Sequence, residues 1–128
     1  MSGCVLFACS DQAPTPAAVG LANPASVNCD KVGGELQIEK DAAGAEYGVC
    51  VFEDNRQCEE WALFRGQCPM GGLRVTGDRT PGARYCVIRG GTYTVTVPAS
   101  EAKTEQGRCG LPDGDSCSAH SLFDGTCS

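Results

Sequence analysis

The sequence is poor in the residues that build a large hydrophobic core. It has one tryptophan, three tyrosines and four phenylalanines in 128 residues, against 17 glycines and seven prolines. A chain of this length forms about one domain, and so little bulky apolar material does not offset chain entropy without covalent cross-links. Ten cysteines are present, and we therefore expect a disulfide-rich scaffold.

Clusters of positive charge and long apolar segments are also missing. The formal net charge of −6 argues against nucleic acid as a partner and disfavours a basic amphipathic helix on an anionic membrane. The longest apolar run is far shorter than the ~20 residues of a membrane-spanning helix. We therefore expect an unidentified protein or envelope component as the partner, no nucleic acid, and membrane contact only through a lipid anchor.

The cysteines lack the spacing of a metal or redox site. No two of them form a Cys-X-X-Cys pair, which fits neither a zinc site nor a thioredoxin-type centre. We expect no metal ion and no cofactor. An oxidising compartment is the simpler explanation for so many cysteines.

The first 22 residues have the features of a signal or lipoprotein remnant and a tether. Residues 1–10 lack a basic region and are too short for a complete signal peptide, so we expect further sequence upstream. Leu6-Phe7-Ala8-Cys9 resembles the end of a bacterial lipobox, and cleavage before Cys9 would leave eight other cysteines, an even number. Lipidation of Cys4 and a bond between Cys4 and Cys9 are the alternatives. Residues 10–22 predict a flexible tether, and we expect the protein in the bacterial cell envelope, in the periplasm or on the outer surface, lipid-anchored or secreted.

The remaining cysteines form two copies of one spacing pattern. The first four are separated by 21, 8 and 10 positions, and the last four by 23, 8 and 10. They are Cys29, Cys50, Cys58, Cys68, Cys86, Cys109, Cys117 and Cys127. Prolines and glycines recur in step with them, as Pro24 with Pro81 and Gly33-Gly34 with Gly90-Gly91. The repeat predicts two disulfide-bonded units, over residues 23–68 and 80–128, joined by a linker over residues 69–79.

Each unit is predicted to fold as helix, strand, strand, helix, which makes the protein α+β. Asn23-Pro24 and Thr80-Pro81 each supply an N-cap and a proline at the first helical position. The glycine pairs Gly33-Gly34 and Gly90-Gly91 end these helices. The last helix of the first unit is predicted over residues 59–65, with an equivalent at the end of the second unit.

Alternating apolar residues predict the strands. The predicted strands lie near residues 36–38 and 47–52 in the first unit, and near residues 93–97 and 108–111 in the second. In the linker, Leu73 and Val75 alternate with polar residues. They predict an additional strand that joins the two sheets.

The predicted final helix bears on how the cysteines pair. A helix over residues 59–65 rises 1.5 Å per residue and would hold Cys58 and Cys68 ~10 Å or more apart. Bonded cysteines need Cα atoms within about 7 Å. Unless the helix is very short, the bond between Cys58 and Cys68 is therefore the least expected of the three possible pairings, and the other two stay open.

Several segments together resemble a known family. They are Asn23-Pro24-Ala25-Ser26-Val27-Asn28-Cys29, Gly33-Gly34, Tyr47-Gly48-Val49-Cys50 and Glu59-Glu60-Trp61-Ala62-Leu63-Phe64-Arg65-Gly66. They resemble a short bacterial envelope domain of unknown function whose members are commonly labelled hemolysin or lipoprotein. The second unit resembles a divergent companion copy, with His120 at the tryptophan position. The resemblance implies an exported, lipid-anchored protein and carries no catalytic residue.

No set of side chains has the pattern of a catalytic site. His120 is the only histidine, and we expect it to be a partly buried surface residue rather than a catalytic base. The acidic pairs Glu53-Asp54 and Glu59-Glu60 are interpreted as residues of a turn and of a helix N-terminus. Trp61 and Phe64 lie three positions apart on one predicted helical face and are expected to pack internally.

Charge differs between the two units. Residues 20–68 hold nine acidic and four basic residues, whereas residues 69–128 hold six of each. In the linker and the second unit, arginines recur every five residues, at Arg74, Arg79, Arg84 and Arg89. This asymmetry favours either attraction of a charged partner or contact between the units.

The sequence therefore favours a non-enzymatic protein, a rigid binding or structural module of the envelope. One alternative is a peptidase inhibitor that presents a stiff loop between Cys50 and Cys58. That loop is Asp54-Asn55-Arg56-Gln57, in which Arg56 would suit a trypsin-like pocket. The other alternative is membrane lysis, for which the family label is the only motive.

Overall fold

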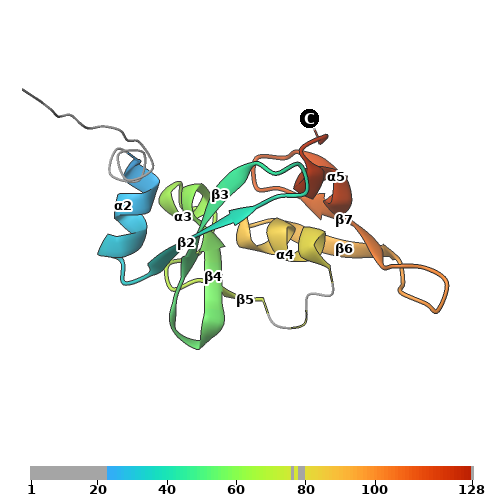
Figure 1. Cartoon of the computed structure of the whole chain (residues 1–128), viewed down its shortest axis with the longest axis horizontal. Coiled ribbons are helices and arrows are strands. Elements are labelled where there is room, and N and C mark those ends of the chain that lie inside the picture. Colours follow the sequence, from blue (N-terminus) through green and yellow to red (C-terminus); the bar gives the residue numbers. More distant parts are fainter. Residues whose placement is uncertain (1–22, 76, 78–79, 128) are drawn as a thin grey trace, which may run out of the picture.

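The chain folds into two small α+β units that lie against each other (Figure 1). This computed structural model describes residues 23–75, 77 and 80–127. The first unit contains α2 (Pro24–Lys31), β2 (Glu35–Lys40), β3 (Glu46–Val51), the 3-10 turn η2 (Glu53–Asn55), β4 (Arg56–Glu59), α3 (Glu60–Phe64) and β5 (Leu73–Arg74). The second contains α4 (Pro81–Ile88), β6 (Thr92–Val97), β7 (Gln106–Gly110), β8 (Ser116–Ser118) and α5 (Ala119–Asp124). The tandem α+β architecture is thus confirmed.

The first helix of each unit begins and ends at the predicted residues. The Asn23 side chain accepts a hydrogen bond of 2.8 Å from the backbone N–H two residues on, and the Thr80 hydroxyl accepts one of 3.1 Å from the N–H three residues on. These bonds satisfy donors that have no partner inside the helix. Gly33 and Gly90 follow the helices with φ of 92° and 86°, a left-handed conformation that favours glycine.

Each sheet contains one strand that the sequence does not predict: β4, inside the first sheet, and β8, at the edge of the second. The antiparallel sheets have the orders β2-β3-β4-β5 and β6-β7-β8. The segments of β4 and β8, Arg-Gln-Cys-Glu and Ser-Cys-Ser, carry no alternating apolar pattern, so their pairing with β3 and β7 gives no signal in the sequence. The linker strand β5 forms but pairs only with β4. It therefore extends the first sheet and does not join the two sheets, which corrects the prediction.

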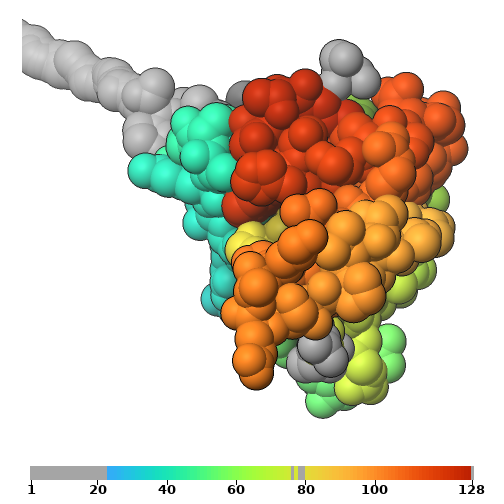
Figure 2. All heavy atoms as spheres, turned by 90° about the vertical axis from the view of Figure 1, so that its right-hand side faces the viewer, coloured from blue at the N-terminus to red at the C-terminus, as the bar shows by residue number. Residues whose placement is uncertain are grey.

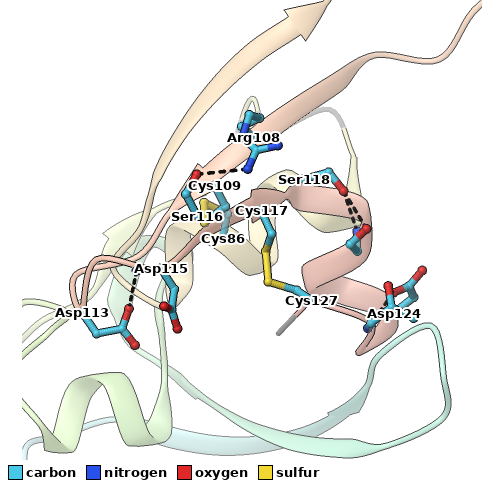
Figure 3. The surroundings of a disulfide bond; sticks show 12 residues. Cys86, Arg108, Cys109, Asp113, Asp115, Ser116, Cys117, Ser118, Asp124 and Cys127 are labelled. Carbon is cyan, nitrogen blue, oxygen red and sulfur yellow. Dashed lines mark hydrogen bonds between the residues drawn. A yellow bond between two sulfur atoms is a disulfide. The ribbon is translucent and has the colours of Figure 1, made fainter.

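All four disulfides lie within the units, and both units have the same connectivity. The bonds are Cys29–Cys50, Cys58–Cys68, Cys86–Cys109 and Cys117–Cys127. In each unit the first bond ties the first helix to a central strand, and the second ties the third strand to the segment after the last helix; Figure 3 shows the two bonds of the second unit.

The bond between Cys58 and Cys68 contradicts the predicted pairing. Cys58 belongs to β4 rather than to a helix, α3 has only five residues, and the chain reverses at Gly66, whose φ is 77°. The two Cα atoms consequently lie 6.0 Å apart. The prediction was wrong because it assumed a longer, straight element between the two cysteines.

The second glycine of each pair makes room for a disulfide. A Cβ atom on Gly34 would lie 2.2 Å from the Cys50 sulfur, and one on Gly91 would lie 2.6 Å from the Cys109 sulfur. Real Cβ atoms do not approach other atoms so closely. The glycine pairs recur because the first glycine ends the helix and the second allows the sulfur bridge to pack against the backbone.

Helix α4 of the second unit packs on the sheet of the first unit. A cluster of buried side chains fills this contact, with Val49 and Val75 from the first unit and linker and Ile88 from α4. At the other end, the N–H of Ala42 in the β2–β3 turn donates a 3.1 Å hydrogen bond to the carbonyl of Phe123 in α5. Figure 2 shows this hairpin, in cyan, beside α5, in red. We call the whole contact, α4 and α5 against β2, β3, β4 and α3, the seam.

Candidate functional site

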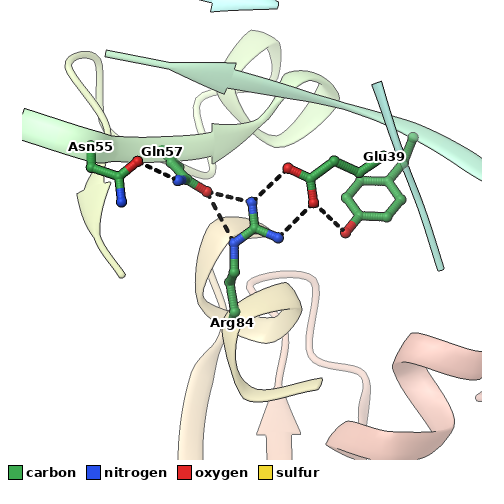
Figure 4. Close-up of polar contacts among 5 residues, drawn as sticks. Glu39, Asn55, Gln57 and Arg84 are labelled. Carbon is green, nitrogen blue, oxygen red and sulfur yellow. Dashed lines mark hydrogen bonds and ion pairs between the residues drawn. The ribbon is translucent and has the colours of Figure 1, made fainter. Parts of the chain in front are cut away.

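Arg84 is the centre of the polar part of the seam (Figure 4). Its guanidinium donates to both carboxylate oxygens of Glu39, at 2.7 and 2.9 Å, and its Nε donates to the side-chain oxygen of Gln57 at 3.0 Å. Gln57 donates in turn to the Asn55 side chain at 2.9 Å, and the Tyr47 hydroxyl donates to Glu39 at 3.3 Å. A two-pronged arginine–carboxylate contact fixes orientation as well as distance. Contact between the units, one of the two roles considered for the arginines, is therefore confirmed for Arg84.

This network shifts the proton equilibria of its members. The hydrogen bond from Arg84 holds the pKa of Glu39 below its ordinary value, although partial burial opposes the change. Burial, helped by the charge of Glu39, raises the pKa of Tyr47 to about 12. At neutral pH the seam therefore contains a charged Glu39–Arg84 pair and a neutral tyrosine.

Acidification is expected to weaken the seam through Glu39. Because the folded pKa lies below the ordinary value of 4.5, the carboxylate adds stability above that value and loses it as pH falls through the lower folded pKa. The free energy of unfolding of wild type should exceed that of Glu39→Gln by about 1 kcal/mol near pH 6, since the pair is partly exposed. The difference should shrink as the pH falls below 4.5 and through the lower folded pKa of Glu39. Urea unfolding across this range measures it.

Glu101→Gln is the matched control for that measurement. Glu101 is exposed in the loop between β6 and β7 and forms no ion pair within the described ranges. Its replacement should leave the free energy of unfolding almost unchanged. Other titrating groups, including Glu59, are common to both proteins and cancel in the difference. A Glu39 contribution that stays constant from pH 6 to pH 3 would contradict the prediction.

Tyr85 joins the aromatic part of the seam. Its ring lies edge-on to that of Tyr47, with ring centroids 4.8 Å apart, and edge-on to that of Phe123 at 5.6 Å. Edge-to-face contacts of this kind stabilise a packed aromatic cluster. The phenol of Tyr85 connects the sheet of the first unit to α5 of the second.

Beside Tyr85 the two units form an open pocket of about 250 Å³. The first unit contributes Glu59, Trp61 and Arg65, and α4 contributes Tyr85 and Arg89. Arg65 lies over the Trp61 ring, 5.4 Å from its centroid, and Arg89 lies over the Tyr85 ring at 5.5 Å. The pocket therefore has two guanidinium groups held against aromatic rings. We call these five residues the seam pocket.

Glu59 holds one wall of the seam pocket in place. Its side chain caps α3, accepting hydrogen bonds from the backbone N–H groups of Trp61 at 3.2 Å and Ala62 at 3.0 Å. Burial raises its pKa above the ordinary value, and the two N–H donors and the nearby Arg89 oppose that change. Both carboxylate oxygens are engaged in the cap, as the interpretation of this acidic pair as helix N-terminal residues requires.

The second acid of the pair, Glu60, joins the two helices of the first unit. It is almost fully buried, and it accepts hydrogen bonds from the Ser26 hydroxyl at 2.5 Å and from the Asn23 amide at 3.4 Å. A Cβ atom on Gly48 would come within 2.5 Å of the Glu60 carboxyl group. Glu60 is therefore a structural residue, in a space that only glycine leaves open.

Phe64 and His120 are more exposed than predicted. Phe64 touches Trp61 edge-on at 5.8 Å but is 47% exposed, because Ala62 and Leu63 occupy the core side of the short α3. The expectation of internal packing is wrong for Phe64. The His120 side chain is 84% exposed, since α5 turns it outward toward Asp124, whose carboxylate lies 3.5 Å away.

The surroundings of His120 do not form a nucleophile and base pair. A pocket of about 510 Å³ has His120 and Ser118 in its wall. However, the Ser118 hydroxyl caps α5 and donates to the Ser121 hydroxyl at 2.8 Å, and no hydrogen bond joins His120 to a serine within residues 80–127. Across the described part of the chain, no group of three or more histidine, cysteine or acidic residues is arranged to hold a metal ion.

The predicted inhibitory loop is compact. Asp54 and Asn55 have φ of 60° and 59°, so the chain turns sharply there. Arg56 is exposed but begins β4, and its carbonyl accepts a 2.8 Å hydrogen bond from the N–H of Phe52. Gln57 is buried in the Arg84 network. The segment after Arg56 is therefore engaged within the protein, and it offers a protease no free extended backbone.

Cys9 and Arg79 lie outside the described residues. Within the predicted loop, Gln57 is buried and joins Asn55 to Arg84, whereas Asp54, Asn55 and Arg56 are all exposed. The seam pocket is not among the sites that the sequence predicts. One signal was available: its residues differ between the repeats, with Asn28 at the position of Tyr85 and Val32 at that of Arg89.

Comparison with known proteins reproduces the internal repeat. A family described as "Domain of unknown function (DUF333)" matches residues 20–67 and again residues 77–126. The chain belongs to the DUF333 family. The two matches confirm that it contains two tandem DUF333 copies.

The chain is similar to two Escherichia coli proteins that are named as uncharacterised. The chain is 39% identical to the uncharacterised protein YoaF of Escherichia coli strain K12 over 71 residues, which are 52% of this chain and 83% of YoaF. It is 30% identical to the uncharacterised protein YdbJ of the same strain over 48 residues, which are 38% of this chain and 54% of YdbJ. No solved structure matches the chain.

Proposed function

We propose that this DUF333 protein is a non-enzymatic binding module of the bacterial envelope, in which two disulfide-bonded units act as one rigid body. The observation that carries the proposal is the seam. Arg84 binds two side chains of the other unit, Glu39 and Gln57, and buried aliphatic and aromatic side chains surround these contacts. A rigid body loses little conformational entropy when it binds a partner.

The disulfides support a location in the envelope. All eight cysteines of the described region are paired, and such bonds persist in oxidising compartments. The lipobox resemblance makes Cys9 the proposed site of a lipid anchor, with residues 10–22 as the tether. No helix of the described region is long and apolar enough to cross a membrane.

Assays for hydrolysis test the non-enzymatic part of the proposal. The purified, oxidised protein should turn over no peptidase, esterase, glycosidase or phosphatase substrate, because the only histidine is exposed and has no nucleophile bonded to it. His120→Ala is the matched variant. Turnover that His120→Ala abolishes would overturn the proposal.

The inhibitor and lysis alternatives have less support and stay predictions. The compact loop around Arg56 does not offer the extended backbone that a protease binds, so titration of a trypsin-like protease should show no inhibition. Inhibition that Arg56→Ala removes would instead establish the inhibitor function. For lysis, release of dye from anionic and neutral vesicles is the corresponding assay.

A further inference from the structure

The seam pocket has the features of a ligand site rather than of a filled contact. It remains open, with a volume of about 250 Å³, although the surrounding seam is closely packed. Pockets for drug-sized ligands measure about 300–1,000 Å³. A space of this size suits a unit no larger than one sugar ring or one amino acid. Its walls come from both repeats, so it exists only when the seam is formed.

The charges in the seam pocket favour an anion. Arg65 and Arg89 form no ion pair within residues 23–75, 77 and 80–127. Glu59 lies close enough to Arg89 for their charges to interact, but its carboxylate oxygens accept hydrogen bonds from two backbone N–H groups and it forms no ion pair with either arginine among the described residues. The seam pocket therefore contains two arginines and one carboxylate, and that carboxylate already caps α3. A guanidinium group without an ion-pair partner binds an oxyanion through paired, charge-assisted hydrogen bonds.

The aromatic rings define the remainder of the ligand. The indole of Trp61 and the phenol of Tyr85 hold the two arginines by stacking, which reduces the rotamer freedom that binding would remove. No aliphatic side chain lines the seam pocket, which disfavours a fatty or branched apolar ligand. A sugar suits this site because one sugar ring fits a volume of about 250 Å³ and its hydroxyl groups bond to polar neighbours.

On this basis we propose that the seam pocket binds an anionic sugar, whose carboxylate or phosphate is held by Arg65 and Arg89. This inference rests on the proposed function and names the ligand class of the module. The positions equivalent to Glu59, Trp61 and Arg65 in the second unit are Ser118, His120 and Asp124. The described part of the chain therefore contains one such site.

Trp61 makes the proposal directly testable. It is the only tryptophan of the chain, so its indole N–H gives a single resonance from the wall of the pocket. NMR titrations of the oxidised protein would use glucuronate, glucose 6-phosphate, neutral glucose and inorganic phosphate at matched ionic strength. We expect at least one anionic sugar to shift the resonance saturably, with a dissociation constant of about 1 mM for so small a ligand. The two anionic sugars distinguish a carboxylate from a phosphate.

Charge-matched variants show whether the arginines bind the anion. Arg65→Gln and Arg89→Gln should each weaken binding about tenfold or more, since each removes a charge-assisted contact. Arg108→Gln makes the same charge change on exposed β7, where Arg108 contacts only Ser116 among the described residues, and should leave binding unchanged. Circular dichroism of each variant checks that the fold is retained.

Four results would overturn the proposal. They are no saturable shift with either anionic sugar, an equal shift with neutral glucose, equally tight binding of inorganic phosphate alone, and undiminished binding by both pocket variants. Calorimetry of the same oxidised sample separates this failure from a failure of the proposed function. If the protein unfolds in a single transition but binds no sugar, the proposed ligand class is wrong and the proposal of a rigid module stands.

Discussion

Replacing Gly90 with alanine is expected to destabilise the protein by about 3 kcal/mol and to separate the two units. Gly90 has a φ of 86°, which costs an alanine about 1–2 kcal/mol. In addition, a Cβ atom there would lie 2.0 Å from the carbonyl oxygen of Gln67 in the other unit. Because Gln67 contributes backbone rather than a flexible side chain, the seam itself must shift. Calorimetry should show two transitions in place of one.

The internal repeat supplies the control for this experiment. Gly33 occupies the equivalent position after α2, has a similar φ of 92°, and has no atom within 4 Å of its added Cβ. Gly33→Ala should therefore cost only the backbone strain, about 1–2 kcal/mol, and should leave a single transition. Equal losses in the two variants would show that Gly90 matters for the turn alone and that the contact with Gln67 contributes nothing.

Removing the bond between Cys29 and Cys50 is expected to have the second large effect. The bond closes a loop of 21 positions, and losing such a cross-link costs about 3 kcal/mol through the freedom gained by the unfolded chain. Both cysteines are fully buried and pack in the core beside Cys58, so Cys29→Ala with Cys50→Ala also leaves a space. We expect a total loss of about 4 kcal/mol, measured by urea unfolding.

The bond between Cys117 and Cys127 is the comparison. It closes only 10 positions, and both cysteines are half-buried at the end of the chain (Figure 3). The double alanine variant should lose about 2.7 kcal/mol, because the shorter loop costs slightly less and little buried volume is removed. If the two double variants lost the same stability, the deep packing of Cys29 and Cys50 would not contribute as described.

The sequence predicts the structure best where one residue type satisfies a requirement of the local backbone. Asn23 and Thr80 cap helices, and the glycine pairs end them, because these needs depend on the backbone of a few neighbouring residues. Each such residue also appears twice at equivalent positions. The duplication therefore predicts the fold class, the two units and their first helices from local signals alone.

Strands β4 and β8 and the disulfide pairing depend on contacts between distant residues. The short polar segment of β4 becomes a strand only because β3 and β5 pair with it on both sides. The assumption of a longer helix then misplaces Cys58 relative to Cys68. The helix has five residues rather than the predicted seven, and the chain reverses at Gly66, which brings the two cysteines together.

The repeat pattern does not predict the seam. Residues that match between the two repeats predict the fold that the units share. The seam, in contrast, is formed by positions at which the repeats differ. Arg84, Tyr85 and Ile88 in α4 correspond to Val27, Asn28 and Lys31 in α2. Within the described structure α2 contacts no second sheet, and Val27, at the position of Arg84, is 45% exposed. Differences between internal repeats are therefore a guide to where the repeats meet.

Calorimetric unfolding of the oxidised wild-type protein tests most directly whether the seam unites the two units. If α4 and the first sheet form one packed body, heating should give a single transition whose calorimetric and van't Hoff enthalpies agree. Two resolved transitions, each with the enthalpy of about half the chain, would show that the units unfold independently and would contradict the account.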